Sequence, residues 1–314
     1  MIKAIFTGKN LIIVAAVVFA AAMVTFPEVT GAGTKTAISI WLNSVVPVLL
    51  PFFIFADFIK KIVSMEKLPC NIYPLIMAFM SGYPMGAKIT GDMVKAGVVN
   101  REKGVHLLSY SLVTGPAFII GTAGAFLGNR QAAVIVAMAH YAGALCNGLF
   151  WKNDAGGKVN KCAGISGTST IKSENFMDNF TCSILSGFRA MAIILAYLMF
   201  FMICADMAET AGLLSFLPVE SWRSFAKGML EMTMGISAVG MCNISLDVKT
   251  ILTAFLISFG GLSVIGQSLS VSGGGWLGGG QLIKIKLTHG LLAGIIAAAM
   301  IIFGNTVFGS SFML

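Results

Sequence analysis

Four ionisable side chains lie in predominantly apolar stretches of this chain, where each could do chemistry. Glu231 is a carboxylate in the apolar stretch 222–246, and a charge in such a place is costly unless it is paired or functional. It could pair with Lys88 or bind a coupling proton or Na⁺; a helix cap or an interfacial position is the alternative. His140 and His289 could relay a proton, although such a histidine more often makes a packing hydrogen bond.

Lys88 stands two residues after Gly82-Tyr83-Pro84-Met85-Gly86, a run that interrupts the apolar pattern. We expect a helix to begin at this run, and its free N–H groups and positive dipole end would favour an anion. The positive charge of Lys88 in the first turn of this helix would favour a carboxylate over a neutral nucleoside. The alternative is that Lys88 extends to the cytoplasmic interface of the membrane.

The elements that position these side chains follow from composition. Hydrophobic residues make up 57% of the chain and charged residues 11%, whereas ordinary soluble domains carry about 25% charged residues. The mean hydropathy is +0.88, so the sequence predicts an all-α integral membrane protein. About seven apolar windows are long enough to cross the hydrocarbon core: 11–26, 38–59, 105–128, 131–151, 181–207, 250–271 and 281–308.

Two further apolar windows, 71–97 and 222–246, are interrupted in the middle. The first contains the run 82–86, and the second contains Thr233-Met234-Gly235. Proline and glycine free backbone groups there, and such groups are tolerated at membrane depth only inside protein or beside a water-filled cavity. Both windows therefore predict re-entrant helical hairpins.

An internal repeat with an offset of 149 residues organises the chain. It pairs Met85-Gly86 with Met234-Gly235 and His140 with His289. The predicted units are an N-terminal helix and loop (1–35), a first repeat (36–152), a cytoplasmic linker (153–177) and a second repeat (178–314). Each repeat is predicted to contain a membrane span, a re-entrant hairpin and two further spans, in that order. Because each repeat thus crosses the membrane three times, an odd number, the second copy is predicted to be inverted in the membrane.

The spans that follow the hairpins are themselves interrupted, at Thr114-Gly115-Pro116 and at Gly260-Gly261 with Gly266-Gln267-Ser268. We expect these breaks to meet the hairpin tips at the bilayer midplane and bind a solute there, as in secondary transporters with inverted repeats. The alternative is that Gly and Pro only permit close helix packing. The predicted substrate-binding residues are Gly82, Tyr83, Pro84, Gly86, Lys88, Thr114, Gly115, Glu231, Thr233, Gly235, Ser263 and Gln267, with Glu231, His140 and His289 as candidates for ion or proton coupling.

Other function classes find little support. The chain has no H-E-x-x-H, G-x-S-x-G or Walker A motif, so we expect neither an enzyme nor a cofactor. Its six cysteines include no C-x-x-C pair, and neither a metal site nor a disulfide framework is indicated. The net charge of +8 is explained by topology rather than by nucleic acid.

Most of the 21 Lys and Arg residues fall in predicted loops on one side. This bias predicts a cytoplasmic N-terminus and an external C-terminus. The predicted cytoplasmic residues are Lys3, Lys9, Lys60, Lys61, Lys67, Lys88, Lys95, Arg101, Lys103, Lys152, Lys158, Lys161, Lys172, Lys284 and Lys286. The predicted external residues are Lys35, Arg130, Arg223, Lys227 and Lys249, and Arg189 lies within a span.

The run Ser81-Gly82-Tyr83-Pro84-Met85-Gly86-Ala87-Lys88 resembles the "SGYPxGAK" hairpin of the YlbJ-type sporulation integral membrane proteins, which belong to the wider nucleoside-recognition or Gate-domain family. The segment 259–264 resembles that family's "FGGLSV" motif, and 115–122 is similar to its "xPxFIxGT" segment. Together these motifs span most of residues 40–310. The chain departs from the family at Leu112-Val113-Thr114, where "TNN" is expected, and at Ile265-Gly266, where a histidine is more usual.

The resemblance implies a relation to concentrative nucleoside transporters, which are trimers with moving hairpin domains. It also implies movement of dipicolinate across a bacterial membrane, such as the outer forespore membrane. From sequence, the function expected is therefore secondary transport of a small anionic solute, driven by Na⁺ or H⁺. Two alternatives stay open: a nucleoside transporter of the same fold, and a Gate-domain protein that acts in sporulation assembly or sensing without transport.

Overall fold

The computed structural model describes residues 8–62, 69–152, 176–273 and 275–308, and in these ranges it contains helices and no strands. The predicted all-α membrane class is confirmed. Most of the predicted linker 153–177 lies outside the described residues, as do Lys3, Lys67, Lys158, Lys161 and Lys172.

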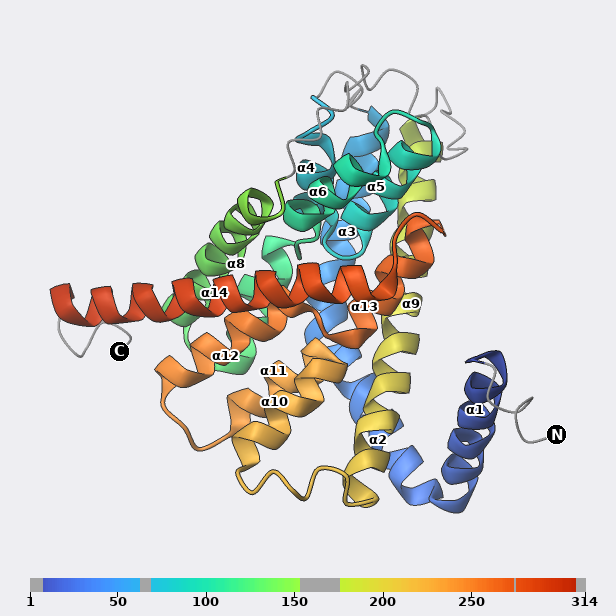
Figure 1. Ribbon diagram of the computed structural model, residues 1–314, viewed down its shortest axis with the longest axis vertical. Helices are drawn as coiled ribbons and strands as arrows, with labels where there is room; N and C mark the ends of the chain where they lie inside the picture. Colours follow the sequence, from blue (N-terminus) through green and yellow to red (C-terminus); the bar gives the residue numbers. More distant parts are fainter. Residues whose placement is uncertain (1–7, 63–68, 153–175, 274, 309–314) are drawn as a thin grey trace.

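The described elements are helices that follow one another along the chain (Figure 1). In the first half they are α1 Gly8–Thr25, α2 Pro27–Ile40, η2 Trp41–Val45, α3 Val46–Ile62, α4 Tyr73–Ser81, α5 Met85–Lys95, α6 Arg101–Ser111, η4 Phe118–Ala123, α7 Gly124–Leu127 and α8 Arg130–Phe150. In the second half they are α9 Phe176–Thr210, α10 Glu220–Leu230, α11 Met232–Met241, α12 Leu246–Phe259, α13 Gly261–Ser272 and α14 Gly279–Phe308.

Five helical stretches among the described residues are long and apolar enough to cross a membrane. They are Pro27–Ile59, Arg130–Phe150, Phe176–Thr210, Leu246–Ser272 and Gly279–Val307, and each overlaps a predicted span. The other two predicted spans correspond to shorter pieces. Window 11–26 falls in α1, and window 105–128 is divided into α6 and the helical stretch Phe118–Leu127, because the chain unwinds between them.

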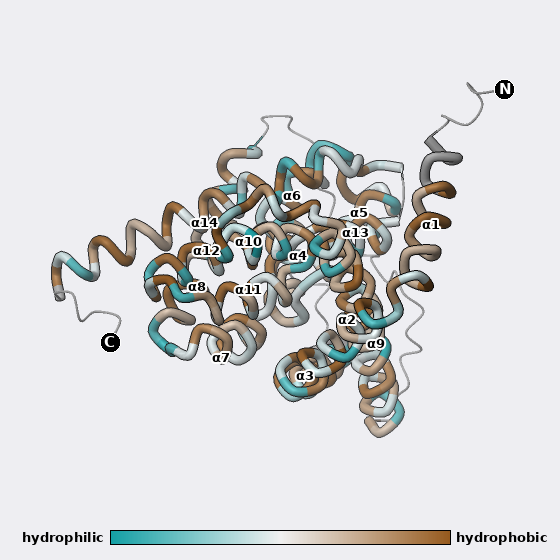
Figure 2. The backbone as a smooth tube through the Cα atoms, turned by 90° about the horizontal axis from the view of Figure 1, so that it is seen from below, coloured by the Kyte–Doolittle hydropathy of each residue, from teal (hydrophilic) through white to brown (hydrophobic). Residues whose placement is uncertain are grey.

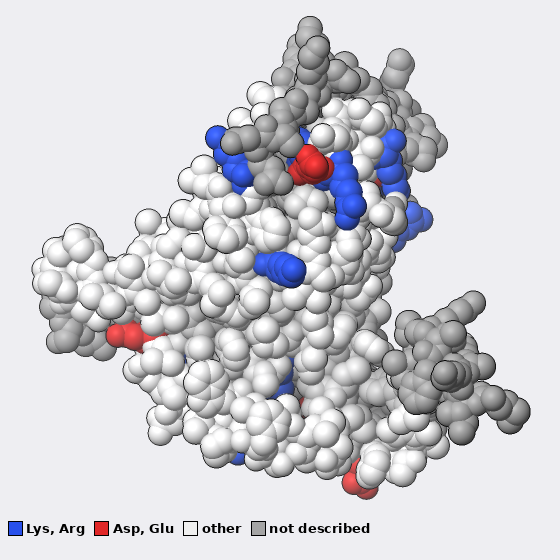
Figure 3. Space-filling model, in the orientation of Figure 1, with Lys and Arg blue, Asp and Glu red and all other residues white. Residues whose placement is uncertain are grey.

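Hydrophobic residues predominate along much of α1, α3 and α14 (Figure 2). Large residues such as Val17, Leu149, Ile295 and Phe303 are more than half exposed, which water would disfavour and a lipid hydrocarbon phase would accept. In contrast, Lys and Arg gather at the end of the molecule formed by α4, α5 and α6 (Figure 3). This distribution is that of a multi-pass membrane protein.

The two predicted hairpins are present as α4–α5 and α10–α11. The first turns at residues 82–84, inside the predicted run. The second turns at Glu231, two residues before the predicted interruption, because the Glu231 carboxylate caps the start of α11 by accepting a hydrogen bond from the Met234 N–H at 2.8 Å. Gly235 therefore lies within α11, and a methyl group there would meet the backbone of Gly228 on α10.

The helices after residue 72 correspond in pairs at the offset of 149 residues. Helix α4 matches α10, α5 matches α11, α6 matches α12, η4 with α7 matches α13, and α8 matches α14. In space, α8 and α14 pack together and both pack on α12. Helix α14 runs across the long axis along which α3 and α9 lie (Figure 1).

The cysteines differ in state. The thiols of Cys146, Cys182, Cys204 and Cys242 are free. Cys70 is disulfide-bonded. The sequence has no cysteine pattern that predicts a disulfide, so this bond was not expected.

Candidate functional site

A small cavity of about 40 Å³ lies where both hairpin tips meet both broken helices. Polar or backbone-exposing residues from four segments line it: Gly82 and Tyr83, Thr114 and Gly115, Glu231 and Thr233, and Gln267. The remaining wall is apolar and comes from Val45, Leu49, Phe52, Phe53, Phe118, Ile194, Met232 and Val264. Seven of the twelve predicted substrate-binding residues thus lie around one space.

The first hairpin tip is built for close contact with the break after α6. Gly82 ends α4 with φ of +69°, a conformation that glycine adopts without strain. A side chain at Gly82 would approach the Gly115 nitrogen, and one at Gly86 would meet the Ser111 carbonyl. The Tyr83–Pro84 peptide bond is cis. Only glycine at these positions lets the tip lie against the broken helix.

The second tip carries a buried carboxylate. Glu231 is 5% exposed, and the hydroxyl groups of Thr233 and Ser263 lie beside it. Ser263 is fully buried, yet its hydroxyl makes no well-formed hydrogen bond among the described residues. No Lys or Arg of the described segments forms an ion pair with Glu231. The cavity therefore contains a buried carboxylate that caps a helix and has no cationic partner among the described residues.

Lys88 does not take part in this arrangement. Its ammonium nitrogen lies 2.9 Å from Asp92 one turn further along α5, and its side chain is 35% exposed. The predicted pairing of Lys88 with Glu231 is therefore absent. Pro84, Gly86, Gly235 and Ser263 also lie outside the cavity lining.

The unwound segment between α6 and η4 is held by α8. The Thr114 N–H donates to His140 Nε2 at 3.1 Å, and the Tyr141 hydroxyl donates to the Thr114 carbonyl at 3.0 Å. These bonds satisfy backbone groups that a helix would otherwise pair internally. The counterpart break is at Gly260 and Gly261, both with positive φ, as expected. The predicted interruption at Gly266-Gln267-Ser268 is wrong, because these residues continue α13.

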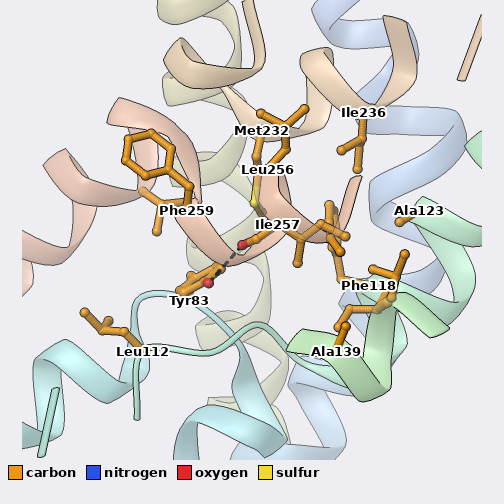
Figure 4. Close-up of a cluster of buried hydrophobic side chains, with 14 of the residues drawn as sticks. Tyr83, Leu112, Phe118, Ala123, Ala139, Met232, Ile236, Leu256, Ile257 and Phe259 are labelled. Carbon is orange, nitrogen blue, oxygen red and sulfur yellow. Dashed lines mark hydrogen bonds between the residues drawn. The ribbon is translucent and has the colours of Figure 1, made fainter. Parts of the chain in front are cut away.

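A lysine that the predicted topology places on the cytoplasmic side lies buried beside the cavity. Lys286 on α14 is 1% exposed, and its nitrogen lies 2.7 Å from the Tyr83 hydroxyl and 3.0 Å from the Leu112 carbonyl. The Tyr83 hydroxyl in turn donates to the Ile257 carbonyl at 3.0 Å (Figure 4). The sequence feature that could have indicated a buried Lys286 is its place three residues before His289 in one apolar helix.

The rings of His140 and His289 lie in contact, with centroids 4.8 Å apart and planes tilted by 34°. Each ring nitrogen has a partner: His140 contacts the Thr114 N–H and Ser258, and His289 contacts the His140 carbonyl and Lys286. Neither ring lines the cavity. These contacts favour the packing interpretation of the two histidines over the proton relay.

The site can hold water, a proton or a small ion, and it offers both donors and acceptors to a polar solute. The described part of the chain contains no group of three His, Cys, Asp or Glu side chains that could bind a metal ion.

The chain is 25% identical to the sporulation integral membrane protein YlbJ of Bacillus subtilis (strain 168) over 299 residues, covering 79% of this chain and 71% of that protein. The YlbJ-type resemblance is thereby confirmed. The similarity extends well beyond the hairpin motif and includes much of the chain that forms the cavity. No family model and no solved structure matches the chain.

Proposed function

We propose that this YlbJ-type protein is a secondary transporter of a small anionic solute, bound between the hairpin tips and the two broken helices. The observation that carries the proposal is the convergence of these four segments on one cavity inside an apolar, multi-pass protein. Broken helices at membrane depth are tolerated where they line a cavity, and in secondary transporters they form the substrate site.

The preference for an anion rests on the first hairpin. Helix α5 begins at Met85, two residues after the cavity-lining Tyr83, and has no side-chain cap. Its Met85 and Ala87 N–H groups already donate to the Gly82 and Pro84 carbonyls, so the positive dipole end of the helix is what would favour an anion at this tip. The buried Lys286 lies behind Tyr83 and adds positive charge near the same tip. Helix α11 differs, because Glu231 already caps it. The resemblance to sporulation proteins suggests a dicarboxylate such as dipicolinate as the first solute to test.

Transport requires the cavity to enlarge. A volume of about 40 Å³ is far below the ~300–1,000 Å³ of ordinary small-molecule pockets. The tips must therefore separate from the broken helices to admit an organic solute. Such a movement is what alternating access demands, and it makes the hairpins the moving gates of the proposed mechanism.

The test is uptake of labelled solutes into liposomes that contain the purified protein. Dipicolinate, a nucleoside and a neutral pyridine of similar size are compared under imposed H⁺ and Na⁺ gradients, with protein-free liposomes as the background. The proposal expects saturable, gradient-dependent uptake of the dicarboxylate. Uptake of the nucleoside alone would support the nucleoside-transporter alternative and contradict the anion preference.

The small size of the cavity is the observation that favours a non-transporting role in sporulation assembly or sensing. That role predicts no uptake of any solute by protein that is folded and monodisperse in the same preparation. This outcome would overturn the transport proposal.

A further inference from the structure

Lys286 is the largest fully buried side chain among the described residues, and it lies between three segments that are distant in sequence. Its nitrogen contacts the Tyr83 hydroxyl at the first hairpin tip and the Leu112 carbonyl at the end of α6. A longer contact of 3.5 Å joins it to His289 Nδ1 on α14 itself. No carboxylate of the described residues forms an ion pair with it.

The partners of Lys286 are all acceptors. The Tyr83 hydroxyl uses its own hydrogen on the Ile257 carbonyl, so towards Lys286 it can only accept. His289 Nε2 lies 2.9 Å from the His140 carbonyl, which cannot donate, so Nε2 carries the hydrogen and Nδ1 presents a lone pair. The Leu112 carbonyl is an acceptor by nature.

Three acceptors require three N–H groups, and an ammonium group has three where a neutral amine has two. The Tyr83 ring adds a fourth favourable contact, because Lys286 Nζ lies 4.4 Å from the ring centroid. The surroundings of Lys286 are therefore those of a cation site, and its own side chain supplies the cation.

We infer that Lys286 is a tethered cation that fills a primary-ammonium site built by the hairpin tip, the broken helix and α14, and so positions Tyr83 at the cavity. Carbonyl groups freed by unwound helices often bind monovalent ions in transporters; here the Leu112 carbonyl is satisfied by the chain itself. The repeat-related position has no such site, since Ala137 and Met232 stand 149 residues away from Lys286 and Tyr83. This inference does not depend on the proposed transport function.

Lys286→Ala removes three methylene groups and the ammonium group, which together correspond to n-propylammonium. We expect this variant in detergent to unfold at a midpoint at least about 5 °C below wild type. Millimolar n-propylammonium should recover most of that loss in the variant and leave wild type unchanged. Neutral n-propanol and N,N,N-trimethylpropylammonium, which lacks N–H donors, should recover none of it.

Two further variants serve as controls. Lys284→Ala removes an exposed lysine on the same helix, and its midpoint should be that of wild type with no response to the amine. Lys286→Met fills the space without charge, so it should be destabilised and should not respond. A Lys286→Met protein as stable as wild type, or equal recovery of Lys286→Ala by n-propanol, would overturn the inference.

If Lys286→Ala cannot be purified as a folded protein, Tyr83→Phe provides the test instead. It keeps the ring and removes one acceptor of the ammonium group. A larger loss in the wild-type background than in Lys286→Met supports the site, because in Lys286→Met the substitution removes only the hydrogen bond to the Ile257 carbonyl. The same loss in both backgrounds would contradict it.

Discussion

Glu231 and Lys286 are the charged side chains buried next to the hairpin tips, one at each tip. The carboxylate could be found from sequence, because it stands in the middle of an apolar window. Lys286 is easily missed, although it stands three residues before His289, since a lysine near the start of a predicted span is usually a topology signal. Only the packing of α14 against the first hairpin tip shows that it is buried.

Glu231→Gln tests whether this carboxylate binds the coupling proton. The amide oxygen can still accept from the Met234 N–H, so the cap and the stability of the protein should be retained. We expect uptake driven by a proton gradient to be abolished, while exchange of solute across the membrane at equal concentrations continues. The control is Glu220→Gln, an exposed position on α10, which should leave both rates unchanged.

Lys88→Gln tests whether Lys88 contributes to anion selection. Lys88 pairs with Asp92 on a partly exposed face and does not line the cavity. Removing such a pair changes stability by about 0–1 kcal/mol, and we expect the uptake rate and the preference for a dicarboxylate to stay as in wild type. Loss of that preference would show that Lys88 reaches the solute after all.

At the scale of elements, the hairpins and the first two breaks could be predicted because proline, glycine and polar residues interrupt long apolar runs. The position of the second turn and the helix through Gly266-Gln267-Ser268 could not. Glycine is compatible with membrane helices, so whether it breaks one depends on its neighbours. Gly235, for example, provides close contact with Gly228 instead of a turn.

Gly86→Ala tests the contact between the first hairpin and α6. The added methyl group meets the Ser111 carbonyl, a backbone group that cannot move aside easily. We expect a loss of roughly 1–3 kcal/mol of stability, measured by thermal unfolding in detergent. Gly31→Ala in α2 is the matched control, because its methyl group meets nothing within 4 Å. A Gly86→Ala protein as stable as wild type would contradict the close approach of the first hairpin to α6.

At the scale of the whole molecule, helices of the two halves correspond at a constant offset of 149 residues, and their inverted arrangement in the membrane stays a prediction. Composition and apolar periodicity were sufficient to predict a multi-pass helical protein. They could not predict how the repeats meet, because that depends on contacts between residues far apart in sequence, such as those of His140 with His289.

The inverted arrangement predicts that equivalent ends of the two repeats face opposite sides of the membrane. Glu102 and Glu220 are both exposed and lie beside the first and second hairpins. In a background without other cysteines, Glu102→Cys should react with a membrane-impermeant thiol reagent only from the cytoplasmic side, and Glu220→Cys only from outside. Reaction of both from one side would exclude inverted repeats.

The central claim is that solute binds in the cavity between the tips and the breaks, and Gln267→Leu tests it most directly. The substitution removes polar groups from the cavity wall and should lose about 1.5–3 kcal/mol of interaction with a charged solute, which corresponds to at least tenfold. The measurement is the initial rate of dicarboxylate uptake into liposomes at subsaturating solute, compared with Gln131→Leu, an exposed position on α8. We predict a rate at least tenfold lower for Gln267→Leu and an unchanged rate for Gln131→Leu. Equal rates for the two variants, with both proteins folded, would contradict the account.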